Sequence, residues 1–65
     1  MNPVKEIRAK LGISQYRLAN LLKINRASVC RYEKGDRHPN YRVLMRLANL
    51  CKKHNINFDK YFGEQ

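Results

Sequence analysis

Acidic residues and long apolar runs are scarce in this sequence, and each scarcity excludes a class of protein. Only five of the 65 residues are Asp or Glu, and no serine–histidine or cysteine–histidine arrangement has a third orienting group. We therefore expect no enzyme activity. No segment reaches the about 18 consecutive apolar residues of a membrane span, and the first residues lack the apolar core of a signal peptide. A cytoplasmic protein outside the membrane is expected.

Cysteine is also rare, because the sequence contains only Cys30 and Cys51. Two cysteines do not make a disulfide framework, so free thiols are favoured. With His38 and His54 they are the four soft metal ligands of the chain, but their spacing matches no zinc pattern. We expect neither a metal nor another cofactor.

Positive charge is abundant by contrast. Fourteen Lys and Arg residues give a formal net charge of +9, which favours nucleic acid, an anionic membrane surface or an acidic protein as a partner. The cations are spread over several predicted helices and loops, whereas a membrane-surface helix gathers them on one face. The aromatic platform that RNA binding commonly needs is absent. Double-stranded DNA is the favoured partner.

The length allows one domain, residues 1–65, and the apolar periodicity predicts an all-α fold. Helices are expected at 3–11, 14–22, 26–33, 40–53 and 57–62. A polar N-cap residue stands at the start of each helix: Asn2, Ser14, Asn25, Asn40 and Asn57. Glycines follow the ends of the first and third helices, at Gly12 and Gly35. Two helices have apolar stripes that we expect to face the core: Leu18, Leu21 and Leu22 on the second, and Leu44, Leu47, Ala48 and Cys51 on the fourth.

The stretch from Ser14 to Gly35 predicts two short helices joined by Lys23-Ile24-Asn25. At about 100° per residue, the second of these helices has two opposite faces. Val29 and Tyr32 lie on one face, and the other face carries Arg26, Ala27, Cys30 and Arg31. Since the apolar face must be buried, the arginine face must point outward. This is the geometry of a helix-turn-helix that contacts DNA.

The ordered set of residues resembles the phage lambda-repressor/Cro-type helix-turn-helix family. The matching positions are Ser14-Gln15, Leu18-Ala19, Leu22, Val29, Arg31, Glu33, Gly35, Pro39, Leu44, Leu47-Ala48 and residues 56–59. The resemblance extends from Val4 to Phe62 and implies a compact five-helix DNA-binding domain, most like a small Cro-type repressor from a phage or prophage. The chain departs from the family at Lys23, where glycine is usual, and at residues 51–57, which are a few residues longer.

The exposed face of helix 26–33 is the expected base-contacting surface. Arg26 and Arg31 can each donate two parallel hydrogen bonds to guanine. The full set expected at the bases is Asn25, Arg26, Ala27, Cys30 and Arg31. The set expected at the phosphates is Ser14, Gln15, Lys34, Arg37, Asn40 and Arg42, because helix N-termini and a basic loop attract anions. The resemblance also implies that Gln15 contacts the DNA backbone, and that Arg8 and Glu33 form an ion pair. If this pair is exposed it contributes only about 0–1 kcal/mol, so its expected use is orientation.

One copy of helix 26–33 covers only a few base pairs, so a two-fold pair on a pseudo-palindromic operator is expected. We expect a weak homodimer, or one that forms only on DNA. Phe58, Tyr61 and Phe62 are the candidate dimer interface, with the protein's own core as their alternative position. Repression is favoured because a small domain has little surface left to recruit polymerase. The alternative function is an antitoxin-type autoregulator that also binds a protein partner.

Overall fold

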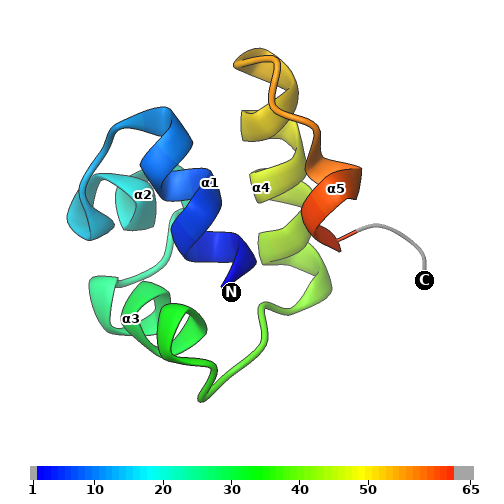
Figure 1. Cartoon of the computed structure of the whole chain (residues 1–65). Helices are drawn as coiled ribbons and strands as arrows, with labels where there is room; N and C mark the ends of the chain where they lie inside the picture. Colours follow the sequence, from blue (N-terminus) through cyan, green and yellow to red (C-terminus); the bar gives the residue numbers. More distant parts are fainter. Residues whose placement is uncertain (1, 63–65) are drawn as a thin grey trace.

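The structure, a computed structural model, describes residues 2–62 and contains five helices in that range (Figure 1). They are α1 (Pro3–Leu11), α2 (Gln15–Leu22), α3 (Arg26–Lys34), α4 (Tyr41–Lys53) and α5 (Phe58–Phe62). Residues 2–62 contain no strand, so the predicted all-α fold is confirmed. Each helix boundary lies within one residue of the expected position. Over the described residues no helix is long and apolar enough to cross a membrane.

Helices α1 to α4 each begin at a polar side chain that accepts a hydrogen bond from the backbone N–H three residues later. These N-caps are Asn2, Ser14, Asn25 and Asn40. Each cap satisfies one of the N–H groups that a helix start leaves without a partner. Asn57 differs from the expectation, because its side chain forms no capping bond within the described part of the chain, residues 2–62. Its carbonyl accepts a backbone bond from Lys60 instead.

The first three helices end at residues in the left-handed conformation. Gly12 and Gly35 have φ values of 68° and 81°, where an L side chain is disfavoured. The end of α2 uses Lys23 at φ 61° instead. A second contact fixes this end, since Arg46 Nη1 of α4 donates a 3.0 Å hydrogen bond to the carbonyl oxygen of Leu22.

The core lies where α1, α2, α3 and α4 meet. The large side chains that are fully buried are Ile7, Leu18, Leu22, Val29, Leu47 and Cys51. Burying one large aliphatic side chain stabilises the fold by about 1.5–3 kcal/mol. These contacts hold the helix-turn-helix to the rest of the molecule.

Two details of the expected core are wrong. Leu21 is 39% exposed, because it lies about 110° around α2 from the centre of the buried arc at about 100° per residue. On α4, Val43 is buried together with Leu47 and Cys51, whereas Leu44 and Ala48 are only partly buried. The inward stripe therefore keeps Leu47 and Cys51 of the prediction, but its centre is rotated towards Val43 by about half of the 100° between successive residues.

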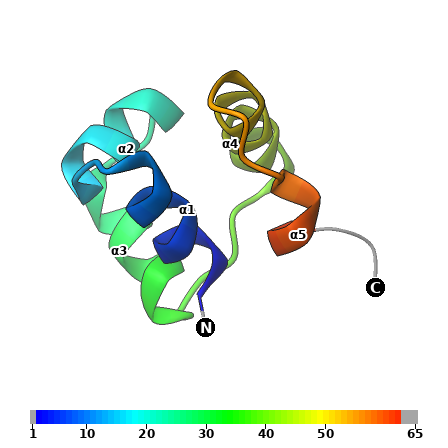
Figure 2. The same ribbon diagram turned by 45° about the horizontal axis from the view of Figure 1, so that its top comes forward.

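The helices form two groups. In Figures 1 and 2, α1, α2 and α3 lie together and α4 and α5 lie beside them, joined by the segment that follows α3. Within this arrangement α3 packs against both α1 and α2, while α4 packs against α2 and α5. The outer face of α3 is therefore left without a covering helix.

Candidate DNA-binding surface

The outer face of α3 carries the predicted base-contacting residues. Arg26, Ala27 and Arg31 are exposed and Cys30 is partly buried, whereas Val29 on the opposite face is 0% exposed. Within residues 2–62, neither Arg26 nor Arg31 forms an ion pair or a side-chain hydrogen bond. Their guanidinium groups are available to an outside acceptor.

Asn25 stands at the N-terminal end of this face, with its side chain engaged in the protein. Its Oδ1 accepts hydrogen bonds from the backbone N–H and the hydroxyl of Ser28, at 2.9 and 3.1 Å. Only its amide nitrogen therefore remains for a base or a phosphate. Capping α3 and contacting DNA can use different atoms of the same side chain.

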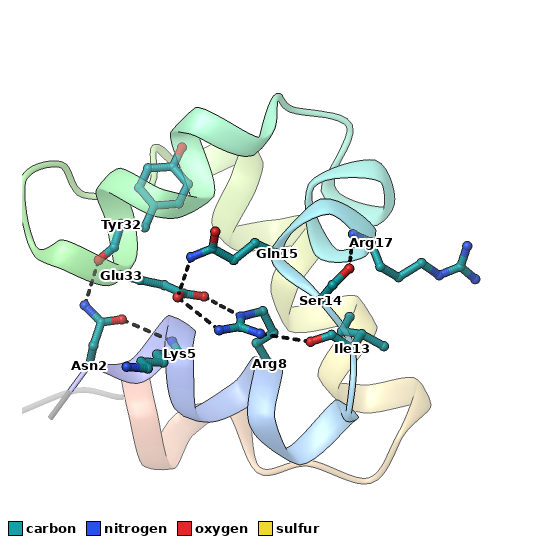
Figure 3. A network of polar contacts seen from close by, with 9 residues as sticks. All are labelled: Asn2, Lys5, Arg8, Ile13, Ser14, Gln15, Arg17, Tyr32 and Glu33. Carbon is teal, nitrogen blue, oxygen red and sulfur yellow. Dashed lines mark hydrogen bonds and ion pairs between the residues drawn. The ribbon is translucent and has the colours of Figure 1, made fainter.

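The N-terminus of α2 is held by a network of polar contacts rather than left free (Figure 3). Ser14 Oγ accepts the backbone N–H of Arg17 at 3.1 Å, and Gln15 Nε2 donates to Glu33 Oε1 at 3.0 Å. Sequence reasoning did not find the Gln15 contact, since its partner lies 18 residues away on another helix. The side chain expected on a phosphate is thus oriented by α3.

Arg8 and Glu33 form the centre of this network. Arg8 Nε lies 2.6 Å from Glu33 Oε2, and the two side chains are 21% and 6% exposed. Arg8 Nη2 also donates to Glu33 Oε1 at 3.3 Å, and Arg8 Nη1 donates to the Ile13 carbonyl at 3.0 Å. The pair is therefore mostly buried, because α1, α3 and the turn before α2 close around it.

The ionisation of Glu33 follows from these contacts. Burial alone raises the pKa of the carboxyl, but hydrogen bonds from Arg8 and Gln15 and the charge of Arg8 outweigh it, so the pKa lies below its ordinary value. The same hydrogen bond has the opposite effect on its donor and raises the pKa of the Arg8 guanidinium. Both groups are charged near neutral pH. The negative charge of Glu33 on α3 is therefore balanced by Arg8 inside the protein.

The loop after α3 and the start of α4 add further cations. Lys34, Arg37 and Arg42 are exposed, and Asn40 Oδ1 accepts the Val43 N–H at 3.0 Å. The N–H groups at the start of α4 and the helix dipole favour an anion there. Lys34 is the last residue of α3, Arg37 lies on the segment that joins α3 to α4, and Arg42 lies on the first turn of α4.

Two exposed tyrosines stand beside the helix starts that we expect to face phosphates. Tyr16 in the first turn of α2 is 65% exposed, and Tyr41 at the start of α4 is 77% exposed. A phenol hydroxyl can donate to a phosphate oxygen. The residues expected at the phosphates did not include Tyr16, although its position two residues after the N-cap Ser14 is a signal that the sequence contains.

The side chains that could bind a metal ion do not cluster among the described residues. Both cysteines are free thiols, and burial raises the pKa of the Cys51 thiol. No group of three or more His, Cys, Asp or Glu side chains over residues 2–62 is arranged to hold a metal ion.

The three aromatic residues of α5 lie partly in the core and partly at the surface. Phe58, Tyr61 and Phe62 pack against the buried cluster yet none is fully buried. The rings of Phe58 and Phe62 stack with their centroids 5.0 Å apart. The Tyr61 hydroxyl is buried without a hydrogen-bond partner among the described residues.

Comparison with known proteins agrees with this geometry. The family model described as helix-turn-helix matches residues 4–54. The chain is 34% identical over 61 residues to the uncharacterized HTH-type transcriptional regulator YgzD of Bacillus subtilis, covering 94% of this chain and 88% of that protein. It is also 46% identical over 47 residues to a Pyrococcus abyssi protein whose name describes an HTH-type transcriptional regulatory protein, covering 72% of this chain but only 15% of that protein. No solved structure matches the chain at a significant level. The chain therefore belongs to the helix-turn-helix family of DNA-binding transcriptional regulators.

Proposed function

We propose that the protein is a Cro-type repressor that inserts the outer face of α3 into the major groove of an operator. The observation that carries this proposal is the outward orientation of Arg26 and Arg31 opposite the buried Val29 and Tyr32. The major groove of B-DNA admits one α-helix, and guanine offers two acceptors that match a guanidinium group.

The phosphate contacts in this proposal come from both sides of α3. Gln15, held by Glu33, would contact the backbone at the start of α2. The exposed cations Lys34, at the last residue of α3, and Arg37 and Arg42, beyond it, would do so at the other side. Such contacts fix the position of the helix along the duplex, while the base contacts determine the sequence.

Two copies on a pseudo-palindromic operator complete the proposal. The partly exposed aromatic residues of α5, Phe58, Tyr61 and Phe62, are the proposed dimer contact. Because these rings also pack against the core, the contact offers limited area, and we propose that pairing is weak until DNA is bound in the cytoplasm.

Selection of bound sites from random duplex DNA tests the proposal, followed by affinity measurements on the selected site. Arg31→Ala should cost about 1–3 kcal/mol on the selected site and relax the preference at one base pair. Random duplex provides the control. An equal loss of affinity for selected and random DNA would move Arg31 from the bases to the phosphates.

A further inference from the structure

Two hollows on the molecule join into one groove between α2 and α4. The first is about 250 Å³ and the second about 200 Å³. They share Leu21 of α2 with Leu50 and Lys53 of α4. We call this surface the α2–α4 groove. Each hollow alone is smaller than the about 300–1,000 Å³ of a typical small-molecule pocket and is of a size that single side chains of a larger partner can enter.

The floor of the α2–α4 groove is apolar. Leu21 is 39% exposed, and Leu11, Ile13 and Leu50 are partly buried around it. A leucine exposed to this degree leaves apolar area in water, and covering that area is favourable at about 25 cal/mol per Å².

The edge of the groove is basic. Arg17, Lys23, Arg46 and Lys53 line it, and neither hollow has a carboxylate among its described lining residues. Arg46 is fixed in place by its 3.0 Å hydrogen bond to the Leu22 carbonyl. An apolar floor with a basic edge is complementary to an apolar surface flanked by acids.

The groove does not include the proposed DNA contacts, and it approaches them at Ile13 and Arg17, which flank Ser14 and Gln15. None of the residues that we expect at bases or phosphates lines either hollow. Leu50 and Lys53 lie ten and thirteen residues after Asn40, about 15–20 Å along α4 at 1.5 Å per residue. Figure 1 shows α4 running away from the segment that follows α3.

We propose that the α2–α4 groove binds an acidic amphipathic helix of a partner protein. Aliphatic side chains on one face of that helix would enter the two hollows, and carboxylates beside them would pair with the basic edge. A DNA backbone satisfies the cations but has no side chains for the floor, so the apolar area around Leu21 favours a protein. The inference does not depend on which DNA sequence the protein binds.

The test uses the full chain and a synthetic helix-forming peptide with leucines on one face and glutamates beside them. Two comparison peptides replace the leucines with serine or the glutamates with lysine. The acidic leucine peptide should shift the amide NMR signals of Leu21, Leu50 and Lys53 while leaving those of α3 unchanged. Both comparison peptides should bind about tenfold more weakly, since each lacks one half of the complementarity.

Matched variants distinguish binding in this groove from nonspecific hydrophobic or electrostatic binding of the peptide. Leu21→Ser should weaken peptide binding, whereas Met45→Ser, at a 45% exposed residue of α4 outside both hollows, should not. Likewise Lys53→Glu should weaken it more than Lys52→Glu, which changes the net charge equally but lies outside the groove. Leu21→Ser should leave DNA affinity unchanged.

Failure of the acidic leucine peptide to bind would overturn the proposal, as would equal binding of the serine peptide or equal effects of Leu21→Ser and Met45→Ser. If duplex DNA shifts the same amides and displaces the peptide, the groove belongs to the nucleic-acid surface and the proposal is wrong. Circular dichroism of each variant checks that it is folded.

Discussion

Lys23 has a backbone conformation that is unfavourable for a residue with a side chain. At φ 61° it ends α2 in the left-handed region, which costs an L-residue about 1–2 kcal/mol. Lys23→Gly should therefore raise the free energy of unfolding by about 0.5–1 kcal/mol, after the greater freedom of glycine in the unfolded chain is subtracted. Urea denaturation measures this difference.

Lys34→Gly is the matched control for this change. Lys34 is also an exposed lysine at the end of a helix, but its conformation is helical, so glycine there should destabilise the protein by up to about 1 kcal/mol. A loss of stability in Lys23→Gly as well would show that the lysine side chain contributes more at the turn than its backbone strain costs.

Arg42 is the residue at which the phosphate assignment is most easily measured. Its side chain is exposed on the first turn of α4. If it neutralises one phosphate, Arg42→Ala should reduce the slope of log K against log salt by about 0.9 on every duplex. Titrations at several salt concentrations give the slope. A change in base preference at constant slope would contradict the assignment.

At the scale of elements, the Arg8–Glu33 pair joins α1 to α3. Because the pKa of Glu33 is lowered by folding, its contribution to stability is complete above the unfolded pKa of about 4.3 and is lost as the pH falls through the folded value. Glu33→Gln should reduce the free energy of unfolding by about 1–3 kcal/mol at pH 7, since hydrogen bonds to a charged group are weakened. The difference from the unchanged protein should shrink as the pH falls below about 4.3.

Denaturant titrations of both proteins across this pH range test the linkage. Glu6→Gln is the control, because Glu6 lies on α1 and forms no ion pair among residues 2–62. A constant difference between Glu33→Gln and the unchanged protein at all pH values would mean that charge on Glu33 does not stabilise the fold.

How far the sequence predicts these elements depends on the range of the interaction. Caps such as Ser14 and Asn25 bond to N–H groups three residues away, so local pattern is enough to place helix boundaries. The exposure of Leu21 depends on where α4 crosses α2, and the Gln15–Glu33 contact depends on how α2 meets α3. Both features are set by the packing of the whole core, and a short stretch of sequence does not contain that information. The outward face of α3 was predictable because its two sides differ strongly in polarity.

The whole molecule predicts the form of its operator. If two copies bind through α5, the DNA should show two protected half-sites with centres about 34 Å apart, one turn of the duplex. Hydroxyl-radical footprinting measures the spacing, and sedimentation at increasing protein concentration measures pairing without DNA. A single unsymmetrical protected site would contradict the two-fold arrangement.

The loosely buried end of the molecule has a consequence for its dynamics. Helix α5 has no fully buried residue, and the Tyr61 hydroxyl is enclosed without a hydrogen-bond partner among residues 2–62. This helix should therefore open locally at less free energy than α1 to α4. Its amide protons should then exchange with solvent first. A second copy docked on α5 would stabilise only the closed form, and by linkage the exchange rate there would fall as protein concentration rises. The exchange rate of the α5 amides and the degree of self-association would then report on the same coupled equilibrium between opening of α5 and pairing of two copies.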